Sequence, residues 1–245
     1  MLKPFELYMG EALEVLRRLP DESVDAVITD PPYSSGGQSL ADRTRSTNKK
    51  YVLSNVATRR PDFSGDNRDQ RSFAYWSTLW LSECLRVARP SAPLVCFSDW
   101  RQLPTTTDAI QAGGWIWRGV AVWDKPAPRP SMGRFASSCE FMVWGSKGAM
   151  PQREAIGCLP GTYRVNVRQA DKHHVTGKPT ELMRHVSRIC PVGGVVLDPF
   201  AGSGSTGVGA LIEGRRFIGI ELSDEYAAIA RTRLEGLELQ ERVTE

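Results

Sequence analysis

The sequence predicts an α/β fold built around a mostly parallel sheet. Short apolar runs typical of buried strands alternate with segments whose apolar residues recur at helical spacing. The chain opens with a strand, a helix and a strand at residues 5–8, 11–19 and 24–29, an order that implies parallel pairing. Two strands end in motifs with an acid followed by proline, which favours a ligand site at the carboxyl edge of the sheet.

The same patterns predict the remaining elements. We expect helices over residues 73–89, 108–112, 179–190, from the glycine-rich turn to 212, and from the N-cap candidate Ser223 to about 237. We expect further strands over 94–97, 115–123, 140–145, 195–198 and 217–220. Residues 34–71, 126–138 and 146–177 show no strong period, so we expect them to be loops.

The composition is that of an ordinary globular protein, with 41% hydrophobic and 24% charged residues in 245. No apolar run approaches the roughly 18 residues of a membrane span, and the first residues lack the apolar core of an export signal. Five cysteines are scattered without a C-x-x-C pair, which favours reduced thiols and argues against a zinc site. We therefore expect one cytoplasmic domain over 1–245, with no metal and no membrane partner.

Positive charge is concentrated in two segments. The net charge is only +3, yet residues 41–71 carry a surplus of four positive charges and residues 125–172 a surplus of five. The rest of the chain is therefore acidic. Two basic inserts, at about 34–71 and 125–172, on an acidic scaffold suit a polyanionic partner better than a small neutral substrate. Solvated loops are the alternative.

The strand at 24–29 ends in Asp30-Pro31-Pro32-Tyr33. Proline has no N–H, so the sheet ladder must end there, and the residue before a proline is held extended. Asp30 is thus fixed at the carboxyl end of a strand, with the flat ring of Tyr33 close behind it. A carboxylate beside a stacking face suits a planar group that bears an amino substituent. The alternative is structural, a strand end followed by a Pro-Pro turn.

A glycine-rich turn at 202–207 lies between a strand and a helix. Gly202 and Gly204 allow close approach of a ligand, and the N–H groups at the helix start suit an anion. Glu221 lies 19 residues after Gly202, at the end of the next strand, where an acid can accept hydrogen bonds from ribose hydroxyls. The loop alone fits NAD and S-adenosylmethionine equally. Only 38 residues follow Gly207, too few for the second half of a dinucleotide fold.

The Asp-Pro-Pro-Tyr motif at 30–33 and Leu-Asp-Pro-Phe-Ala-Gly-Ser-Gly-Ser-Thr at 197–206 together resemble the amino-group DNA methyltransferases, which use S-adenosylmethionine. The catalytic motif comes first, as in the circularly permuted β class of N6-adenine and N4-cytosine enzymes. The resemblance implies a Rossmann-like methyltransferase fold whose seven-stranded, mostly parallel sheet includes an antiparallel hairpin. Strand 195–198 would be central, flanked by 217–221 and then 5–8 on one side and by 24–29 on the other. Strands 93–97, 115–123 and 140–144 would complete the far side.

Two further segments are similar to family motifs. Gly10-Glu11-Ala12-Leu13 resembles Gly-Asp-x-Leu, whose acid lies near the cofactor adenine, with Glu11 in place of Asp. The segment 174–179 resembles His-Pro-Thr-x-Lys-Pro, with Val175 in place of the first proline, and implies Lys178 and Thr180 beside the methionine end of the cofactor. The expected cofactor-binding residues are Glu11, Lys178, Thr180, Asp198, Phe200, Ala201, Gly202, Ser203, Gly204, Ser205, Thr206, Glu221 and Leu222.

The resemblance implies methyl transfer to an exocyclic amine of a base in DNA. That amine is a poor nucleophile, so we expect the Asp30 carboxylate and the Pro31 carbonyl to accept its two N–H groups while Tyr33 stacks on the base. Pro32 completes the catalytic motif. Alignment of nitrogen, methyl and sulfur supplies much of the remaining rate, and the base must be flipped out of the duplex. The sequence contains no Pro-Cys dipeptide, which disfavours chemistry at cytosine C5.

Aspartate at position 30 favours adenine N6 as the target. Cytosine N4 is the alternative, followed by a catalytically silent DNA-binding subunit and a dehydrogenase. The expected partner is double-stranded DNA; a homodimer and a cognate restriction endonuclease stay open. The candidate DNA-contacting residues are Arg43, Arg45, Lys49, Lys50, Arg59, Arg60, Arg129, Arg134, Arg164 and Arg168.

Overall fold

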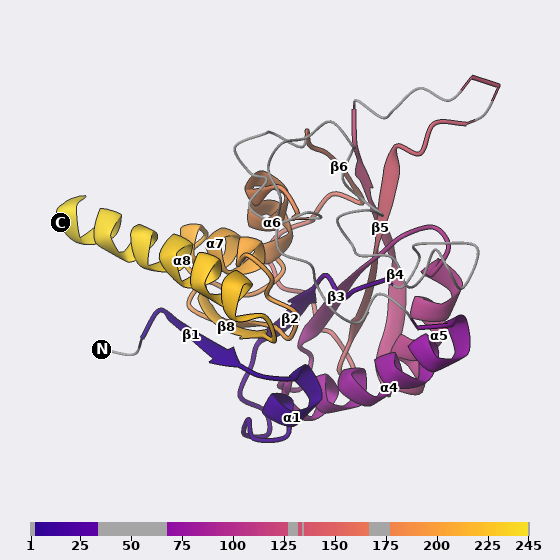
Figure 1. Ribbon diagram of the computed structural model, residues 1–245, viewed down its shortest axis with the longest axis horizontal. Helices are drawn as coiled ribbons and strands as arrows, with labels where there is room; N and C mark the ends of the chain where they lie inside the picture. Colours follow the sequence, from indigo (N-terminus) through magenta and orange to yellow (C-terminus); the bar gives the residue numbers. More distant parts are fainter. Residues whose placement is uncertain (1–2, 34–67, 127–131, 134, 167–176, 245) are drawn as a thin grey trace.

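The computed structural model describes residues 3–33, 68–126, 132–133, 135–166 and 177–244, with side chains described up to 237 (Figure 1). In this part of the chain, eight strands form one sheet in the order β1-β8-β7-β2-β3-β5-β4-β6. The strands are β1 Phe5–Met9, β2 Ala26–Thr29, β3 Pro93–Ser98, β4 Ile116–Asp124, β5 Cys139–Ser146, β6 Thr162–Arg164, β7 Val195–Asp198 and β8 Arg216–Glu221. The helices are α1 Ala12–Leu16, α4 Gln70–Val87, α5 Leu103–Ala112, α6 Thr180–Ser187, α7 Ser205–Ile212 and α8 Asp224–Thr244.

The expected strand order is confirmed. The run β1, β8, β7, β2 and β3 pairs in parallel, with β7 and β2 side by side at its middle. Strands β3, β5 and β4 then pair antiparallel and form the predicted hairpin. Because β2 precedes β7 in the chain, the strand that runs into the Asp-Pro-Pro-Tyr motif comes before the strand that runs into the glycine-rich turn.

The prediction of seven strands is wrong by one. The eighth strand, β6, pairs in parallel with β4 at the edge of the sheet, through Val122 and Thr162 among others. It has only three residues, of which Tyr163 alone is buried, so the sequence carries no alternating pattern that could reveal it. Strands β5 and β6 both fall within the basic segment 125–172.

Helices cover both faces of the sheet (Figure 1). Helices α1, α4 and α5 pack on one face, where Trp80, Leu81 and Ile110 are buried. Helices α6, α7 and α8 pack on the other, where Leu182, Val208 and Leu234 are buried. All four side chains of β2 and of β7 are buried, as expected for parallel strands covered on both sides.

Most helices differ in length from the prediction: α1 and α6 are shorter, α8 is longer, and α4 and α5 begin earlier than expected. Helix α5 starts at Leu103 rather than at residue 108, because its first turns are rich in threonine and proline and carry no apolar period. Helix α4 starts at Gln70, where the Asp69 side chain accepts hydrogen bonds from the N–H groups of Arg71 and Ser72 and caps the helix. No helix within the described ranges is long and apolar enough to cross a membrane.

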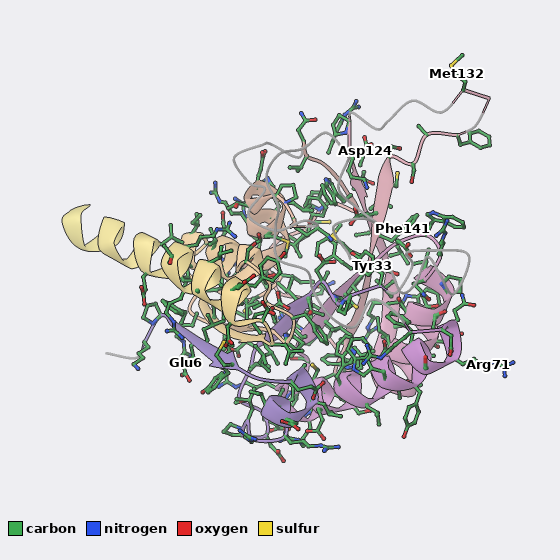
Figure 2. The ribbon with its side chains drawn as sticks, in the orientation of Figure 1. Glu6, Tyr33, Arg71, Asp124, Met132 and Phe141 are labelled. Atoms are coloured by element: carbon green, nitrogen blue, oxygen red, sulfur yellow. The ribbon has the colours of Figure 1, made fainter. Side chains whose placement is uncertain are left out.

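Met132, between β4 and β5, lies away from the body of the molecule in the view of Figure 2, and its side chain is almost fully exposed. Phe135, also between these strands, is fully exposed. The sequence predicts a loop here, and the described residues 132, 133 and 135 lie outside helices and strands.

Candidate active site

Asp30 lies immediately after β2, at the carboxyl edge of the parallel strands. Its Oδ1 accepts a hydrogen bond of 2.5 Å from the Tyr33 hydroxyl, and its Oδ2 lies 2.6 Å from the Lys178 ammonium. Pro31 is buried, while Pro32 and Tyr33 are half-buried. Tyr33 appears at the centre of the view in Figure 2. The motif therefore holds its carboxylate between a phenol and an ammonium group.

Lys178, just before α6, is 5% exposed and lies between two carboxylates. Besides Asp30, its Nζ lies 3.2 Å from Glu140 Oε2 and donates a 3.1 Å hydrogen bond to the Tyr33 hydroxyl. The ammonium also lies 5.3 Å from the centre of the Tyr33 ring and 5.1 Å from that of Phe97. The family motif led us to expect Lys178 beside the cofactor, and the structure places it against the catalytic candidates.

The charges in this cluster influence one another. Burial raises the pKa of Asp30, against the opposing effect of the Lys178 charge. Burial and the neighbouring Asp30 carboxylate raise the pKa of Tyr33 well above its ordinary value, so the phenol stays protonated. Burial alone would lower the pKa of Lys178, but Asp30 and Glu140 outweigh it and raise that pKa. Lys178 is therefore a permanent cation.

Asp198 is the last residue of β7, and its buried carboxylate accepts three hydrogen bonds next to the site. Its Oδ1 accepts hydrogen bonds from the Thr29 hydroxyl at 2.7 Å and from the Phe200 N–H at 3.0 Å, and its Oδ2 accepts one from the Thr206 hydroxyl at 2.6 Å. The side chain is buried, and burial raises the pKa of Asp198 to about 6. The carboxylate thus joins β2, β7 and α7, and it is not presented at the surface.

Glu221, at the end of β8, faces the glycine-rich turn. Its Oε2 accepts a 2.7 Å hydrogen bond from the Gly202 N–H, and its Oε1 accepts one of 2.8 Å from the Ser223 N–H. Gly202 has a φ of +52° and Gly204, the N-cap of α7, a φ of +79°, which non-glycine residues rarely adopt. Glu221 is half-buried, and each of its oxygens has one backbone donor, which leaves each a lone pair for a further hydrogen bond.

The structure divides the other expected cofactor residues into two groups. Glu11, Thr180, Phe200 and Gly202 are half-buried, and Leu222 is exposed. The second group consists of buried residues: Ala201, Ser203, Gly204, Ser205 and Thr206. Glu11 also caps α1 by accepting a 3.0 Å hydrogen bond from the Glu14 N–H, and the Phe200 ring packs edge-on against Trp80. In the first group, the side chains of Glu11, Thr180, Phe200 and Leu222 are at least partly accessible.

Glu221 and Phe200 fit the adenosine part of a cofactor. The Glu221 carboxylate offers acceptors for a ribose diol, and the neighbouring Phe200 ring offers an apolar contact. Asp30 lies across the same edge, since β2 and β8 flank β7. No cluster of three or more His, Cys, Asp or Glu side chains that could hold a metal occurs among the residues described.

Three residues of this region were missed in the sequence. Arg233 on α8 donates hydrogen bonds to the Ser203 carbonyl and to the Thr180 hydroxyl, and so links the glycine-rich turn to α6. Glu140 on β5 and Lys125 after β4 extend the charge cluster of Asp30 and Lys178. One signal was available, because Glu140 is the only acid in the basic stretch 125–153 and begins an apolar strand.

Of the ten candidate DNA contacts, Arg164 alone belongs to the described residues. It ends β6, its side chain is exposed, and it lies 3.6 Å from Asp124. The others lie outside the described residues: Arg43, Arg45, Lys49, Lys50, Arg59, Arg60, Arg129, Arg134 and Arg168. These nine stay predictions.

Comparison with known proteins gives consistent matches over most of the chain. A family model described as DNA methylase matches residues 24–232. YubD of Escherichia coli strain K12, named as a methylase, is 30% identical over 227 residues, which span 92% of this chain and 88% of YubD. The Type II methyltransferase M.HinfI of Haemophilus influenzae is 29% identical over 249 residues, which span 92% of this chain and 67% of that protein.

Solved structures share the fold. The cytosine-N4-specific PvuII DNA methyltransferase superposes with a TM-score of 0.72 at 19% identity, covering 95% of this chain and 87% of that one. The complex of M1.HpyAVI with SAM superposes with a TM-score of 0.67 at 23% identity, covering 94% and 98%. The predicted methyltransferase fold, with its antiparallel hairpin, is confirmed.

Proposed function

Because this chain belongs to the N6/N4 DNA methylase family, we propose that it transfers a methyl group from S-adenosylmethionine to the exocyclic N6 of adenine in double-stranded DNA. At the level of the family it is a DNA amino-methyltransferase. The choice of adenine, the cofactor and the roles of single residues are our proposal. The observation that carries it is the Asp30 carboxylate, fixed at the sheet edge beside Tyr33 and close to the glycine-rich turn.

The proposed cofactor site uses the half-buried residues around the glycine-rich turn. Glu221 would accept hydrogen bonds from the ribose hydroxyls, Phe200 would contact the adenosine, and Glu11 would lie near its base. The M1.HpyAVI structure with SAM, which has the same fold, supports this assignment. When bound, S-adenosylmethionine supplies a methyl group that its sulfonium already activates.

The proposed catalytic step depends on Asp30 and Pro31. Oδ1 of Asp30 accepts one hydrogen bond from Tyr33, and Oδ2 accepts one from Lys178. Each oxygen therefore retains a lone pair that can accept an N–H of the base amine. Together with the Pro31 carbonyl, the carboxylate stabilises the positive charge that develops on the attacking nitrogen. Tyr33 stacks on the flipped base, and the fixed sheet edge provides the alignment.

The choice of adenine as the methylated base is the most specific part of the proposal. Aspartate at the first position of the motif favours adenine in the family that the sequence resembles. Cytosine N4 is the second candidate, because the PvuII enzyme, which shares the fold, is cytosine-N4-specific. The intact cluster of Asp30, Tyr33 and Lys178 speaks against a silent DNA-binding subunit. Family membership leaves the dehydrogenase alternative without support.

We further propose a single catalytic domain over 1–245 whose basic segments 34–71 and 125–172 bind the DNA backbone. M.HinfI, a relative at 29% identity, is a Type II methyltransferase, which supports a role in restriction-modification with a cognate endonuclease. A DNA substrate fits the expected cytoplasmic location. A homodimer is a further proposal, and gel filtration at several protein concentrations tests it.

A labelling experiment tests the function and the base together. The protein is incubated with genomic DNA and methyl-labelled S-adenosylmethionine, and the DNA is digested to nucleosides. Label in N6-methyladenine supports the proposal, and label in N4-methylcytosine replaces adenine with the second candidate. DNA binding without label contradicts the proposed activity.

A further inference from the structure

Four side chains of alternating charge form a row from Lys125 to Asp30. Lys125 Nζ lies 2.9 Å from Glu140 Oε1, Glu140 Oε2 lies 3.2 Å from Lys178 Nζ, and Lys178 Nζ lies 2.6 Å from Asp30 Oδ2. The four side chains are mostly shielded, with 27%, 20%, 5% and 21% of their surface exposed in that order. Lys125, directly after β4, and Glu140, on β5, belong to the antiparallel part of the sheet, and Asp30 follows β2 in the parallel part.

Glu140 is the central acid of this row. Burial of its carboxylate is offset by Lys178 and Lys125, which lower the pKa of Glu140, so it is ionised at neutral pH. Its Oε2 contacts Lys178 as an ion pair, without hydrogen-bond geometry. Glu140 therefore acts on the Lys178 ammonium chiefly through its charge.

That charge matters because Lys178 has two opposing effects on the proposed reaction. The ammonium keeps Asp30 ionised, but a cation so close also weakens Asp30 as an acceptor and repels the positive charge that develops on the attacking amine. A second carboxylate on the opposite side of the ammonium reduces both unfavourable effects. Lys125 in turn partly offsets the electrostatic effect of the Glu140 charge, and the four charges of the row sum to zero.

We propose that Glu140 is a positioning residue of the methyl-transfer reaction: it holds the Lys178 ammonium between two carboxylates, so that Asp30 keeps its strength as acceptor of the base amine. This inference rests on the proposed function. Glu140 contacts Lys178 and Lys125, and its negative charge also raises the pKa of Asp30. The described titratable groups that face Asp30 are Lys178 before α6, Tyr33 in its own loop, Glu140 on β5, Cys96 on β3 and Asp198 on β7.

The test uses Glu140→Gln, which keeps the size of the side chain and removes its charge. We expect kcat for methyl transfer to fall roughly 10- to 100-fold while KM for S-adenosylmethionine changes less than about twofold. Loss of a nearby negative charge lowers the pKa of Asp30, so the acid limb of the kcat/KM profile moves to lower pH. Glu235→Gln, which removes an exposed acid of α8 outside both basic segments, is the matched control and leaves kcat, KM and the acid limb unchanged.

Lys125→Met gives a prediction of opposite sign. Without Lys125 the full charge of Glu140 acts on its neighbours, so the acid limb moves to higher pH. In the background of Glu140→Gln, the same substitution has no further effect, because Lys125 acts through Glu140. Carbon-13 NMR titration of the Asp30 carboxyl in the cofactor-free variants measures these shifts without turnover.

The outcomes separate the inference from the proposed function. If the unmodified protein transfers no methyl group, the proposed function falls, and the inference falls with it. If it is active and Glu140→Gln retains its kcat, the inference alone is overturned. The inference is also overturned if Glu140→Gln loses activity while the acid limb and the Asp30 titration stay in place, since that pattern indicates a merely structural role.

Discussion

Thr29 donates a buried hydrogen bond of 2.7 Å to Asp198, and this bond joins the two strands that end in the functional motifs. Thr29 is the last residue of β2, directly before Asp30, and Asp198 is the last residue of β7, directly before the turn that leads to the glycines. Because the bond crosses from one strand end to the next, it fixes the catalytic motif relative to the proposed cofactor loop. Its loss should affect stability and alignment together.

Thr29→Val tests this bond, because valine matches threonine in shape and lacks the hydroxyl. Asp198 Oδ1 keeps only the Phe200 N–H, so we expect the free energy of unfolding to fall by about 1–3 kcal/mol. Urea denaturation followed by circular dichroism measures the change. Thr232→Val, at an exposed position of α8, is the control and should change stability by less than about 0.5 kcal/mol. Equal stability of the two variants would contradict the assigned role.

The pH dependence of stability tests the environment of Asp198. Its pKa in the folded protein is about 6, above the ordinary value of 3.8, so folding favours the protonated form. The corresponding stabilisation is complete below pH 3.8 and is lost as pH rises through 6. The stability difference between the unmodified protein and Asp198→Asn should therefore shrink by up to about 3 kcal/mol between pH 4 and pH 7. Denaturation at several pH values measures it, and a constant difference would refute the raised pKa.

Asp30→Asn tests the proposed catalytic acceptor. The amide keeps the shape but loses the charge, so we expect methyl transfer to fall at least about 100-fold. Calorimetric titration with S-adenosylmethionine should show nearly unchanged affinity, because Asp30 follows β2 whereas Glu221 and Phe200, the proposed adenosine contacts, follow or end β7 and β8. Asp108→Asn, an exposed acid of α5, controls for loss of charge. Full activity of Asp30→Asn would remove Asp30 from the mechanism.

Glu221→Gln tests the proposed ribose contact. The glutamine oxygen can still accept from one backbone N–H, so the fold should be kept, while the charged acceptor for the ribose hydroxyls is lost. We expect the Kd for S-adenosylmethionine to rise roughly tenfold, with kcat at saturating cofactor nearly unchanged. Fluorescence titration and initial rates separate the two effects. An unaltered Kd would place the ribose elsewhere.

The sequence predicts best what depends on local pattern. Strands β2 and β7 are apolar up to their last residues and run into recognisable motifs, so their type and order could be expected. Strand β6 could not, because three residues with one buried side chain carry no period. The pairing of Glu140 with Lys178 was also beyond the sequence, since it depends on β5 and on the segment before α6, which are far apart in the chain. Lys178 was identified from a family motif, but its contact with Asp30 required the fold.

Lys178→Met tests the charge balance at Asp30 by removing the neighbouring positive charge, where Glu140→Gln removes a negative one. The substitution keeps the length of the side chain but leaves the carboxylates of Asp30 and Glu140 without the cation between them. Loss of the positive charge raises the pKa of Asp30 further, so the acid limb of the kcat/KM profile should move to higher pH, opposite to the effect of Glu140→Gln. We expect activity at neutral pH to fall and to recover in part as pH rises, with a loss of stability of about 3–5 kcal/mol. Rate profiles from pH 5 to pH 9 measure the shift, and an acid limb that stays in place would show that Lys178 does not control the ionisation of Asp30.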